Sequence, residues 1–427
     1  MRKKINFILN AVLEKVKSSE KELKEIESLL GVFLEKFKKN LKSLKIDAEV
    51  FVGGSFAKKT VIKKGAYDID VFVRFGKKSY EKNVSDLVSM ALRNFKNVLR
   101  IHGSRDYFQV KINPSLFIEI VPVKKIKNLK EADNITDLSY SHVKYINKKI
   151  KSQRILDEIK ITKAFCYANG CYGAESYIKG FSGYSLELLI YFYGSFIRFI
   201  KEMSKVKKDE KVVVDIERHF RNKNIVLMDL NSAKLNSPVI VIDPTYKSRN
   251  ALAALSEETF YKFKEDCKKF LKTPSVKFFE EKKIDLNKIK LDAKKKSYEF
   301  VLLEAKTDKQ EGDVAGSKLI KFYRHLCSET EKLYEIKNCG FNYNNKKSAR
   351  YFFVVKNKKE VVLEGPKIDD LKNISKFKKK HGKTFIKKGR IHAKNKIKLQ
   401  IKEFVNVWKK KNSQKLKEMS IINLKVI

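Results

Sequence analysis

Two aspartates stand two residues apart in a strongly apolar run of this sequence. Asp68 and Asp70 occur in YDIDVFV, residues 67–73. In a β-strand successive side chains point to opposite faces, so both carboxylates are expected on one face and the apolar residues on the other. Two carboxylates on one strand face repel each other unless a cation sits between them. The pair therefore predicts a divalent metal site, with Mg²⁺ as the ion because it takes oxygen ligands and shares them with phosphates.

A third carboxylate for this site is expected from a second strand. Glu119 lies in LFIEIVPV, residues 116–123, after an apolar run at 108–112 and a turn at 113–115, and this order predicts a hairpin. Three acids can hold two metals roughly 3.5–4 Å apart, one activating an attacking hydroxyl and the other holding the leaving phosphate. The alternative is that Glu119 is simply an exposed acid in a strand.

A glycine-rich turn precedes the aspartates. Gly53, Gly54 and Ser55 offer backbone N–H groups and a hydroxyl that a phosphate can approach closely, because glycine has no side chain. The alternative is that the glycines only form a turn and the aspartates lie on a solvated face. The turn, the alternating strand and the downstream acid occur in order, which favours a combined phosphate and metal site.

These stretches resemble a known superfamily. GGSFAKKTVIKKGAYDIDVF is similar to the signature of the polymerase-beta-type nucleotidyltransferases, which implies metal-dependent transfer of a nucleoside monophosphate to a hydroxyl. Further stretches resemble, in order and spacing, the archaeal-type (class I) CCA-adding tRNA nucleotidyltransferases. They are SYSHVKY (139–145), ITKAF (161–165), YGAE (172–175), GFSGY (180–184), IDP (242–244) and RN (249–250). The match is close from about residue 51 to 279 and faint beyond.

The resemblance implies template-independent addition of C, C and A to the 3′ end of tRNA from CTP and ATP, with release of pyrophosphate. It implies that His142 and Lys163 contact the triphosphate, that Tyr172 and Ser182 meet the ribose or triphosphate, and that Arg249 lies near the base and the tRNA end. The implied nucleotide-binding residues are Gly54, Ser55, Lys58, His142, Lys163, Tyr172, Ser182 and Arg249.

Some positions depart from the family or have plainer explanations. The family usually has Arg where Lys58 stands and Asp where Glu119 stands, which puts the rate in question more than the reaction type. Lys163 could extend to solvent along its helix, and Arg249 could pair structurally with Asp243. His142 could be a surface histidine, and Tyr172 could cap a helix end.

The expected fold is a mixed α/β (α+β) multidomain chain. Residues 1–147 are predicted as a polymerase-beta-like nucleotidyltransferase head, with a helix over 84–98, and 148–258 as a helical neck that binds the nucleotide and its base. Residues 259–368 are predicted as a small α/β body, and 369–427 as a basic helical tail that contacts tRNA.

The charge of the chain predicts a polyanionic partner. Lys and Arg number 95 against 50 acids among 427 residues, a formal net charge of +45. No long apolar span is evident, so nucleic acid is favoured over membrane. We expect the basic tail to hold the tRNA acceptor stem and T-arm through their backbone. The sequence leaves a homodimer open.

The cysteines and the N-terminal residues indicate the compartment. The five cysteines form no CxxC pair and no Cys/His metal spacing, so they are expected to be buried reduced thiols. The N-terminal residues lack an uninterrupted apolar core with a cleavage site, which predicts a cytoplasmic protein.

Other functions fit part of the pattern. A poly(A) polymerase would share the acids and the glycine turn, and an oligoadenylate-synthase-like nucleotidyltransferase would need no RNA primer. The GFSGY and Arg249-Asn250 motifs disfavour the synthase. A non-enzymatic RNA-binding scaffold with a decayed head is disfavoured because all three acids and the glycine turn are present.

Overall fold

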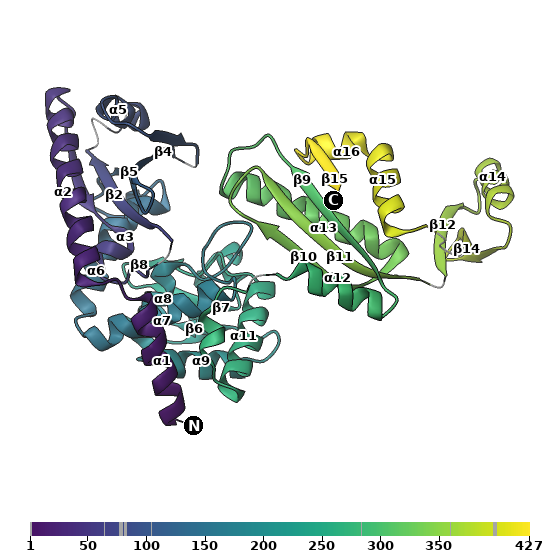
Figure 1. Cartoon of the computed structure of the whole chain (residues 1–427), viewed down its shortest axis with the longest axis horizontal. Helices are drawn as coiled ribbons and strands as arrows, with labels where there is room; N and C mark the ends of the chain where they lie inside the picture. The colour runs from purple at the N-terminus through teal and green to yellow at the C-terminus, as the bar shows by residue number, and fades with distance from the viewer. Residues whose placement is uncertain are drawn as a thin grey trace. The chain divides into compact units, whose positions relative to one another are not determined.

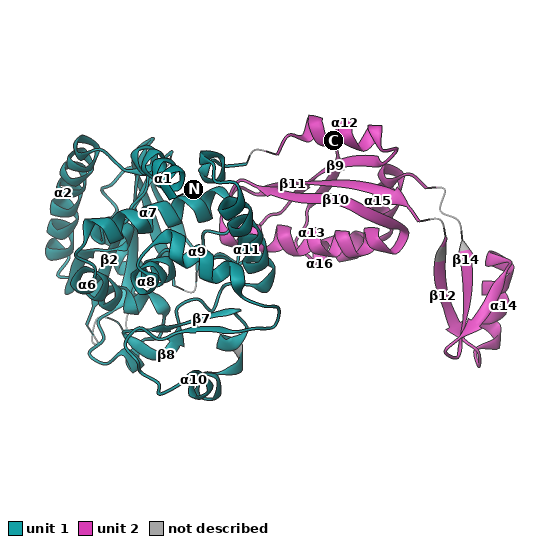
Figure 2. Cartoon of the chain, turned by 90° about the horizontal axis from the view of Figure 1, so that it is seen from below, with its two compact units in different colours: residues 1–282 teal, residues 283–427 magenta. Residues whose placement is uncertain are grey.

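A computed structural model describes residues 2–63, 65–76, 80, 83–103, 105–282, 284–358, 360–395 and 399–427. The chain divides into two compact units, Met1–Lys282 and Lys283–Ile427 (Figure 2). Both units combine helices with sheets, so the predicted mixed α/β multidomain fold is confirmed.

The first unit contains a five-stranded sheet in the order β1-β2-β5-β4-β3 (Figure 1). β2 and β5 run parallel, and the other neighbouring strands run antiparallel. The hairpin predicted around residues 113–115 is confirmed as β4 and β5. The strands are β1 (Ala48–Val52), β2 (Tyr67–Phe75), β3 (Val98–Ile101), β4 (Tyr107–Asn113) and β5 (Leu116–Lys124).

Two helices cover one face of this sheet. α2 (Glu20–Ser43) and α5 (Val84–Ala91) pack apolar side chains against Ile69, Val71 and Val73, which are fully buried. The predicted helix over 84–98 is wrong in its second half. It ends at Ala91, and Asn97 adopts a left-handed φ of 56° just before β3 begins.

The rest of the first unit is mainly helical. Its core joins many aromatic side chains, among them Phe165, Phe181 and Phe263, and α1 packs here although it precedes the sheet in sequence. A small sheet in the order β6-β7-β8 lies beside the helices. The helices are α1 (Arg2–Val16), α3 (Gly54–Ala57), α6 (Ser139–Lys149), α7 (Gln153–Ala168), α8 (Gly183–Tyr193), α9 (Phe196–Lys205), α10 (Lys223–Asp229) and α11 (Glu257–Lys272), with short 3₁₀ turns η1 (Leu129–Glu131), η2 (Ile135–Leu138), η3 (Ser232–Leu235) and η4 (Val276–Phe279), and the strands are β6 (Val212–Val214), β7 (Val239–Asp243) and β8 (Tyr246–Asn250).

The second unit is built on a four-stranded antiparallel sheet in the order β10-β11-β9-β15. Its core includes Trp408 from α15, Leu303 from β9 and Leu424 from β15. The elements are α12 (Leu286–Lys295), β9 (Glu299–Lys306), α13 (Asp313–Leu333), β10 (Tyr334–Tyr343), β11 (Ser348–Asn357), α15 (Ile401–Lys411), α16 (Ser413–Glu418) and β15 (Asn423–Val426).

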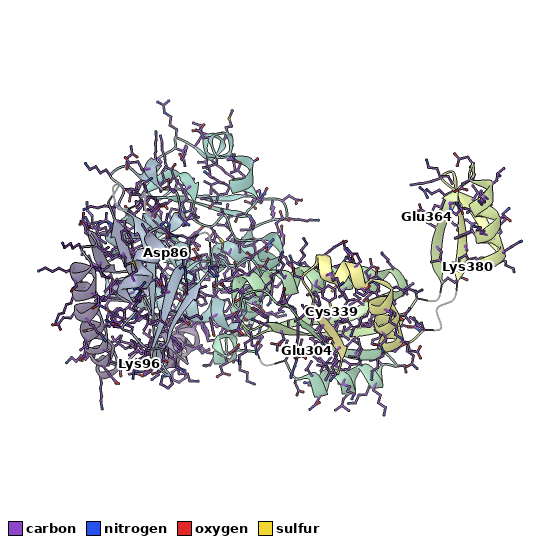
Figure 3. The ribbon with its side chains drawn as sticks, turned by 90° about the horizontal axis from the view of Figure 1, so that it is seen from above. Asp86, Lys96, Glu304, Cys339, Glu364 and Lys380 are labelled. Carbon is purple, nitrogen blue, oxygen red and sulfur yellow. The ribbon has the colours of Figure 1, made fainter. Side chains whose placement is uncertain are left out.

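The stretch predicted as a basic helical tail contains strands as well as helices. Residues 361–395 form a separate three-stranded sheet in the order β12-β14-β13 with α14, where Glu364 and Lys380 are labelled in Figure 3. Residues 401–426 return to the four-stranded sheet and its core. The elements of the small sheet are β12 (Val361–Lys367), α14 (Leu371–His381), β13 (Thr384–Lys387) and β14 (Arg390–Asn395).

The five cysteines are all free thiols. Cys166, Cys171 and Cys267 are buried as predicted, whereas Cys327 and Cys339 are only partly buried, so the prediction of burial is wrong for these two. Among the helices in the described ranges, none combines the length and the apolarity needed to cross a membrane.

The last strand is expected to stabilise the second unit. Leu424 is 1% exposed and pairs with Ala305 of β9, so Leu424→Ala should lower the free energy of unfolding by about 2–4 kcal/mol. Trp408 is the only tryptophan of the chain and is buried in this core, so its fluorescence in guanidinium titrations reports this unit. Ile422→Ala is the control, because Ile422 is 66% exposed. Equal losses for both variants would contradict the role of β15.

Candidate active site on the acidic face of the first sheet

The acidic face of the first sheet is formed by β2 and β5. Asp68 and Asp70 alternate with buried apolar residues of β2, so their carboxylates point away from the core, as predicted. β5 runs parallel to β2, with Glu119 directly opposite Asp70 in the register. Residues paired across neighbouring strands share a face, so the three acids lie on the same side of the sheet.

Crowding and burial change the proton affinity of these acids. Burial, together with the charges of Asp70 and Asp68, raises the pKa of Glu119 to about 7, although the Gln109 side-chain amide donates to its carboxylate at 3.3 Å. Burial also raises the pKa of Asp70, against the charge of Lys58, which lowers it. The carboxylates therefore stand in a site where a nearby cation would stabilise their charged forms.

The chemistry of this face fits a divalent cation, since all three groups are oxygen donors. Within the described residues, no group of three His, Cys, Asp or Glu side chains stands at metal-binding spacing. Asp68, Asp70 and Glu119 thus share a face without forming a closed set of ligands. A metal at this position would be held by these carboxylates together with oxygens from a substrate.

The glycine turn is packed directly against the acidic face. Gly54 has a φ of +58°, and a Cβ atom placed on it would lie 1.7 Å from Oδ2 of Asp70. The backbone N–H of Gly53 donates to the carbonyl oxygen of Asp70 at 2.8 Å. Glycine is therefore required at position 54 by both its backbone conformation and its contact. Ser55 follows in the first turn of α3, beside the same carboxylate face.

Lys58 and Lys163 meet at a carboxylate that the sequence motifs did not single out. The Nζ atom of Lys58 donates to Oε2 of Glu187 at 2.7 Å, and that of Lys163 donates to Oε1 of Glu187 at 2.8 Å. The hydroxyl of Thr60 also donates to Oε1 of Glu187 at 2.6 Å. Burial alone would raise the pKa of Glu187, but Lys163 and Lys58 outweigh it and lower the pKa to about 2. The charges of both lysines oppose the burial that raises the pKa of Asp70, so this cluster lies near the acidic face.

A second buried carboxylate orders His142 and Arg249. Asp243 is fully buried, and its Oδ2 accepts from Nε2 of His142 at 2.9 Å and from the Arg249 guanidinium at 2.6 Å. Tyr184 donates its hydroxyl to Oδ1 at 3.1 Å, and its ring stacks on the His142 ring with 4.0 Å between centroids. Burial lowers the pKa of His142, although Asp243 opposes the shift. The lowered pKa favours the neutral imidazole, whose Nε2 faces the Asp243 carboxylate.

Tyr172 and Ser182 lie beside the lysines. Tyr172 forms an isolated parallel bridge with Phe181, and a Cβ atom on Gly183 would lie 3.0 Å from its hydroxyl and 3.7 Å from Nζ of Lys163. Ser182 is the N-cap of α8, because its hydroxyl accepts from the backbone N–H of Ser185 at 3.1 Å.

The fold therefore brings the sequence-predicted residues to one place. The glycine turn is in contact with the acids, and Nζ of Lys58 lies 5.7 Å from the centroid of the Tyr184 ring, which joins the lysine cluster to the Asp243 group. The elements β2, β5, α3, α6, α7, α8 and β8 lie in the same unit (Figure 1). The hydroxyl oxygen of Ser182 also caps α8.

Comparison with known proteins gives this arrangement a family. Residues 34–166 match the model of the nucleotidyltransferase domain, and residues 157–280 match that of the second domain of tRNA nucleotidyltransferase. The CCA-adding enzyme of Nanoarchaeum equitans (strain Kin4-M) is 33% identical over 349 residues, which cover 81% of this chain and 83% of that protein. The chain belongs to the CCA-adding enzymes. The member from Methanocaldococcus jannaschii is 28% identical over 399 residues, covering 91% of this chain and 87% of that protein.

Two solved structures have a fold similar to part of this chain. A poly(U) polymerase with bound magnesium and 3′-dATP superposes with a TM-score of 0.52 at 15% identity, covering 66% of this chain and all of that one. A cytoplasmic RNA terminal U-transferase gives a TM-score of 0.51 at 15% identity with the same coverage. These structures share the nucleotidyltransferase fold with the CCA-adding enzymes. Nucleotidyltransferases of this kind typically use a divalent metal.

Three residues of the site were missed from the sequence as functional candidates. Glu187 stands in none of the motifs, whereas Thr60 and Tyr184 occur only as members of the longer stretches GGSFAKKTVIKKGAYDIDVF and GFSGY. The signal for Glu187 was present, because it is a single charge in the apolar run LELLI at 186–190. A charge inside a buried helix requires a partner. Asp243 was considered only as a partner of Arg249, and that pairing is confirmed at 2.6 Å.

The crowded carboxylates predict that Glu119→Gln stabilises the metal-free protein at pH 8. The pKa of Glu119 is about 7 in the folded chain against an ordinary value of 4.5, so its contribution to stability is full below pH 4.5 and is lost as pH rises through 7. The substitution removes this loss, which is on the order of 1–3 kcal/mol. The free energy of unfolding measured without divalent metal at pH 5 and at pH 8 checks the expectation.

Glu49→Gln is the matched control for this measurement. Glu49 lies on β1 of the same sheet, where Lys125 and Arg74 lower its pKa. Its replacement should leave the chain no more stable at pH 8. A Glu119→Gln variant less stable than the wild type at pH 8 would contradict the crowding of the acids.

Proposed function

We propose that this protein adds C, C and A to the 3′ end of tRNA, without a nucleic-acid template, from CTP and ATP. The observation that carries the proposal is its similarity to the CCA-adding enzyme of Nanoarchaeum equitans over 83% of that protein's length. The acidic face and glycine turn of the first sheet support the chemistry. We propose that the protein works in the cytoplasm, where these substrates occur.

The reaction is a nucleotidyl transfer. The 3′-hydroxyl oxygen of tRNA forms a bond to the α-phosphorus of the incoming nucleotide, the bond from that phosphorus to the bridging oxygen breaks, and pyrophosphate leaves with the electron pair. Asp68, Asp70 and Glu119 would hold Mg²⁺, which supplies charge stabilisation to the attacking and leaving oxygens when bound. The proton of the hydroxyl passes to solvent water.

The nucleotide is proposed to lie between the acidic face and the helices. Backbone N–H groups at Gly54 and Ser55 would bind phosphate oxygens, and the cluster of Lys58 and Lys163 would offset their negative charge. Arg249 and His142, both held by Asp243, would lie toward the base and ribose together with Tyr172 and Ser182. Because Asp243 already fixes Arg249, little side-chain entropy is lost when a nucleotide binds.

The remaining parts of the chain are proposed to bind tRNA. We propose a head at residues 1–147 and a nucleotide-binding neck at 148–258, and we propose that the basic residues of 369–427 contact tRNA. Residues 401–426 of that stretch also complete the four-stranded sheet of the second unit. The net charge of +45 suits an RNA backbone, and α14 carries four basic residues in its last turn. Contacts with the acceptor stem and T-arm would be made through phosphates and 2′-hydroxyls.

The decisive experiment uses tRNA that lacks its three terminal nucleotides. The protein is incubated with this tRNA, Mg²⁺ and labelled CTP and ATP, and the product ends are sequenced. We expect C, C and A in that order, with arrest after the third addition. Long A tails would identify a poly(A) polymerase, products without tRNA would identify an oligoadenylate-type synthase, and no product from either nucleotide would refute the proposal.

Removal of either aspartate tests the metal face. Asp68→Ala and Asp70→Ala should each lower incorporation of both CTP and ATP by at least about 100-fold, because several kcal/mol of transition-state stabilisation are lost. The affinity for tRNA should be unchanged within about twofold. Asp47→Ala is the control, since Asp47 is exposed just before β1. Near-normal incorporation by either variant would contradict the proposal that these aspartates hold a catalytic metal.

Loss of Arg249 tests the nucleotide end of the site. Arg249→Ala should lower kcat/KM for both nucleotides about tenfold or more, or increase misincorporation, because a buried charge pair with Asp243 is broken. Lys247→Ala is the matched control, because Lys247 is an exposed cation two residues away on β8. Steady-state kinetics with each nucleotide and sequencing of the products measure both effects. Unchanged CTP and ATP kinetics and fidelity would show that Arg249 does not serve the nucleotide.

A further inference from the structure

A buried carboxylate organises the two lysines beside the acidic face. Glu187 lies on α8, Lys163 on α7 and Lys58 directly after α3 (Figure 1). The Glu187 side chain is 0% exposed, that of Lys163 is 2% exposed and that of Lys58 is 8% exposed. Lys58 is therefore the member of the three that reaches furthest toward solvent.

The hydrogen bonds of the two lysines differ. Lys163 Nζ donates to the carbonyl oxygen of Thr60 at 3.2 Å, to its hydroxyl at 2.8 Å and to Oε1 of Glu187 at 2.8 Å. These contacts engage the Lys163 ammonium with groups of the protein interior. Lys58 gives one hydrogen bond to Glu187 at 2.7 Å, so its ammonium can serve further acceptors. Lys163 is thus a support inside the protein, and Lys58 faces the site.

The charges of the cluster suit an anionic ligand. Two ammonium groups meet one carboxylate, which leaves a net positive charge within a buried region. Its neighbours include carboxylates and aromatic hydroxyls as well as a guanidinium and an imidazole. The charged and titratable groups that interact with this cluster are Asp70 of β2, Tyr172, Tyr184 of α8 and His142 of α6, and Arg249 stands over the same Tyr184 ring.

The cluster also ties separate segments together. Thr60 and Lys58 belong to the segment that continues the glycine turn, and the backbone N–H of Thr60 donates to the carbonyl oxygen of Ser55 at 2.9 Å. Glu187 and Lys163 belong to neighbouring helices of the unit. A displacement of Glu187 would therefore move both Lys58 and the glycine turn.

We propose that Glu187 is a positioning residue that presents Lys58 to the β- and γ-phosphates of the incoming nucleotide, with Lys163 and Thr60 bracing its carboxylate. The proposal rests on the proposed function and names the device by which its site recognises a triphosphate rather than a monophosphate. The ammonium of Lys58 is held at a fixed point before the nucleotide arrives, so less conformational entropy is lost on binding. Glu187 itself does not touch the nucleotide.

A purely structural ion pair would behave differently. Loss of such a pair would lower stability and weaken the binding of every nucleotide alike. A positioning role concerns only ligands that carry the outer phosphates, so the ratio of the affinities for CTP and CMP separates the two roles. If Glu187 only neutralised the two lysines, its removal would raise the affinity for CTP, because the lysines would then attract the triphosphate more strongly.

The test measures equilibrium binding of CTP and of CMP, with Mg²⁺ and without tRNA, to the full-length wild type and to Glu187→Gln. We expect the preference for CTP over CMP to fall about tenfold in the variant, with CMP binding unchanged within about twofold. Glu158→Gln is the matched control. Glu158 is a partly buried carboxylate on α7 that accepts from the backbone N–H of Phe196 at 2.8 Å, in the same unit.

Thermal unfolding is recorded in parallel. If Glu187→Gln does not fold, Glu187→Asp replaces it, because the shorter carboxylate keeps its charge but cannot span both ammonium groups, and the same ratio should fall at least threefold. A CTP preference equal to or above that of the wild type in the folded variant would overturn the proposal. A wild-type protein that binds CTP but adds nothing to tRNA would refute the proposed function and leave the role of Glu187 to be decided by the ratio.

Discussion

The parallel pairing of β2 with β5 is the constraint on which the site depends. It sets Glu119 directly across from Asp70, so that three carboxylates share one face of the sheet. Parallel neighbours need a crossover, and here the connection passes through α5, β3 and β4. A shift of the register by one residue would turn Glu119 into the apolar core and bring an apolar side chain to the acids. The buried alternation of Ile69, Val71 and Val73 makes such a shift costly.

The helices of the first unit add what the sheet cannot supply. Glu187 and Asp243 are both buried carboxylates, and each accepts a hydrogen bond from a segment far away in the sequence. The bond from Lys58 to Glu187 spans 129 residues, and that from His142 to Asp243 spans 101. Removing one partner from such a group leaves an uncompensated buried charge, which is strongly destabilising. These groups therefore help to fix the relative positions of the head segment and the helices, in addition to their apolar packing.

Local patterns in the sequence were sufficient for the acidic face. The period-two alternation around Asp68 and Asp70 gives the correct face, and the glycine at position 54 has the left-handed backbone that its packing against Asp70 requires. The wider set of residues and the class of fold came from the resemblance to a family. Ion-pair partners that are distant in the sequence are harder to predict. No sequence pattern around Glu187 indicates Lys58 as its partner, because the two residues come together only when the separate segments pack in the folded chain.

The basic region after residue 360 was the least predictable. Its lysines suggested a helical tail, but β12, β14 and β13 form a sheet there. Its strands bury few side chains, among them Ile391 and Ala393, so the alternation that marks a strand is weak. The four-stranded sheet, within the predicted α/β body, has a clearer sequence pattern, because Val301 and Leu303 of β9 are fully buried.

The pairing of β15 with β9 bears on how the second unit folds during synthesis. Residues 303–306 find their partners only at 423–426, after the small sheet and two further helices have been made. A ribosome adds about 5–20 residues per second, so this edge of β9 stays open for several seconds while the chain is growing. An open strand edge can pair with a neighbouring chain. Nascent copies on one messenger are therefore most prone to associate wrongly in this interval, and the high positive charge that suits RNA also keeps them apart.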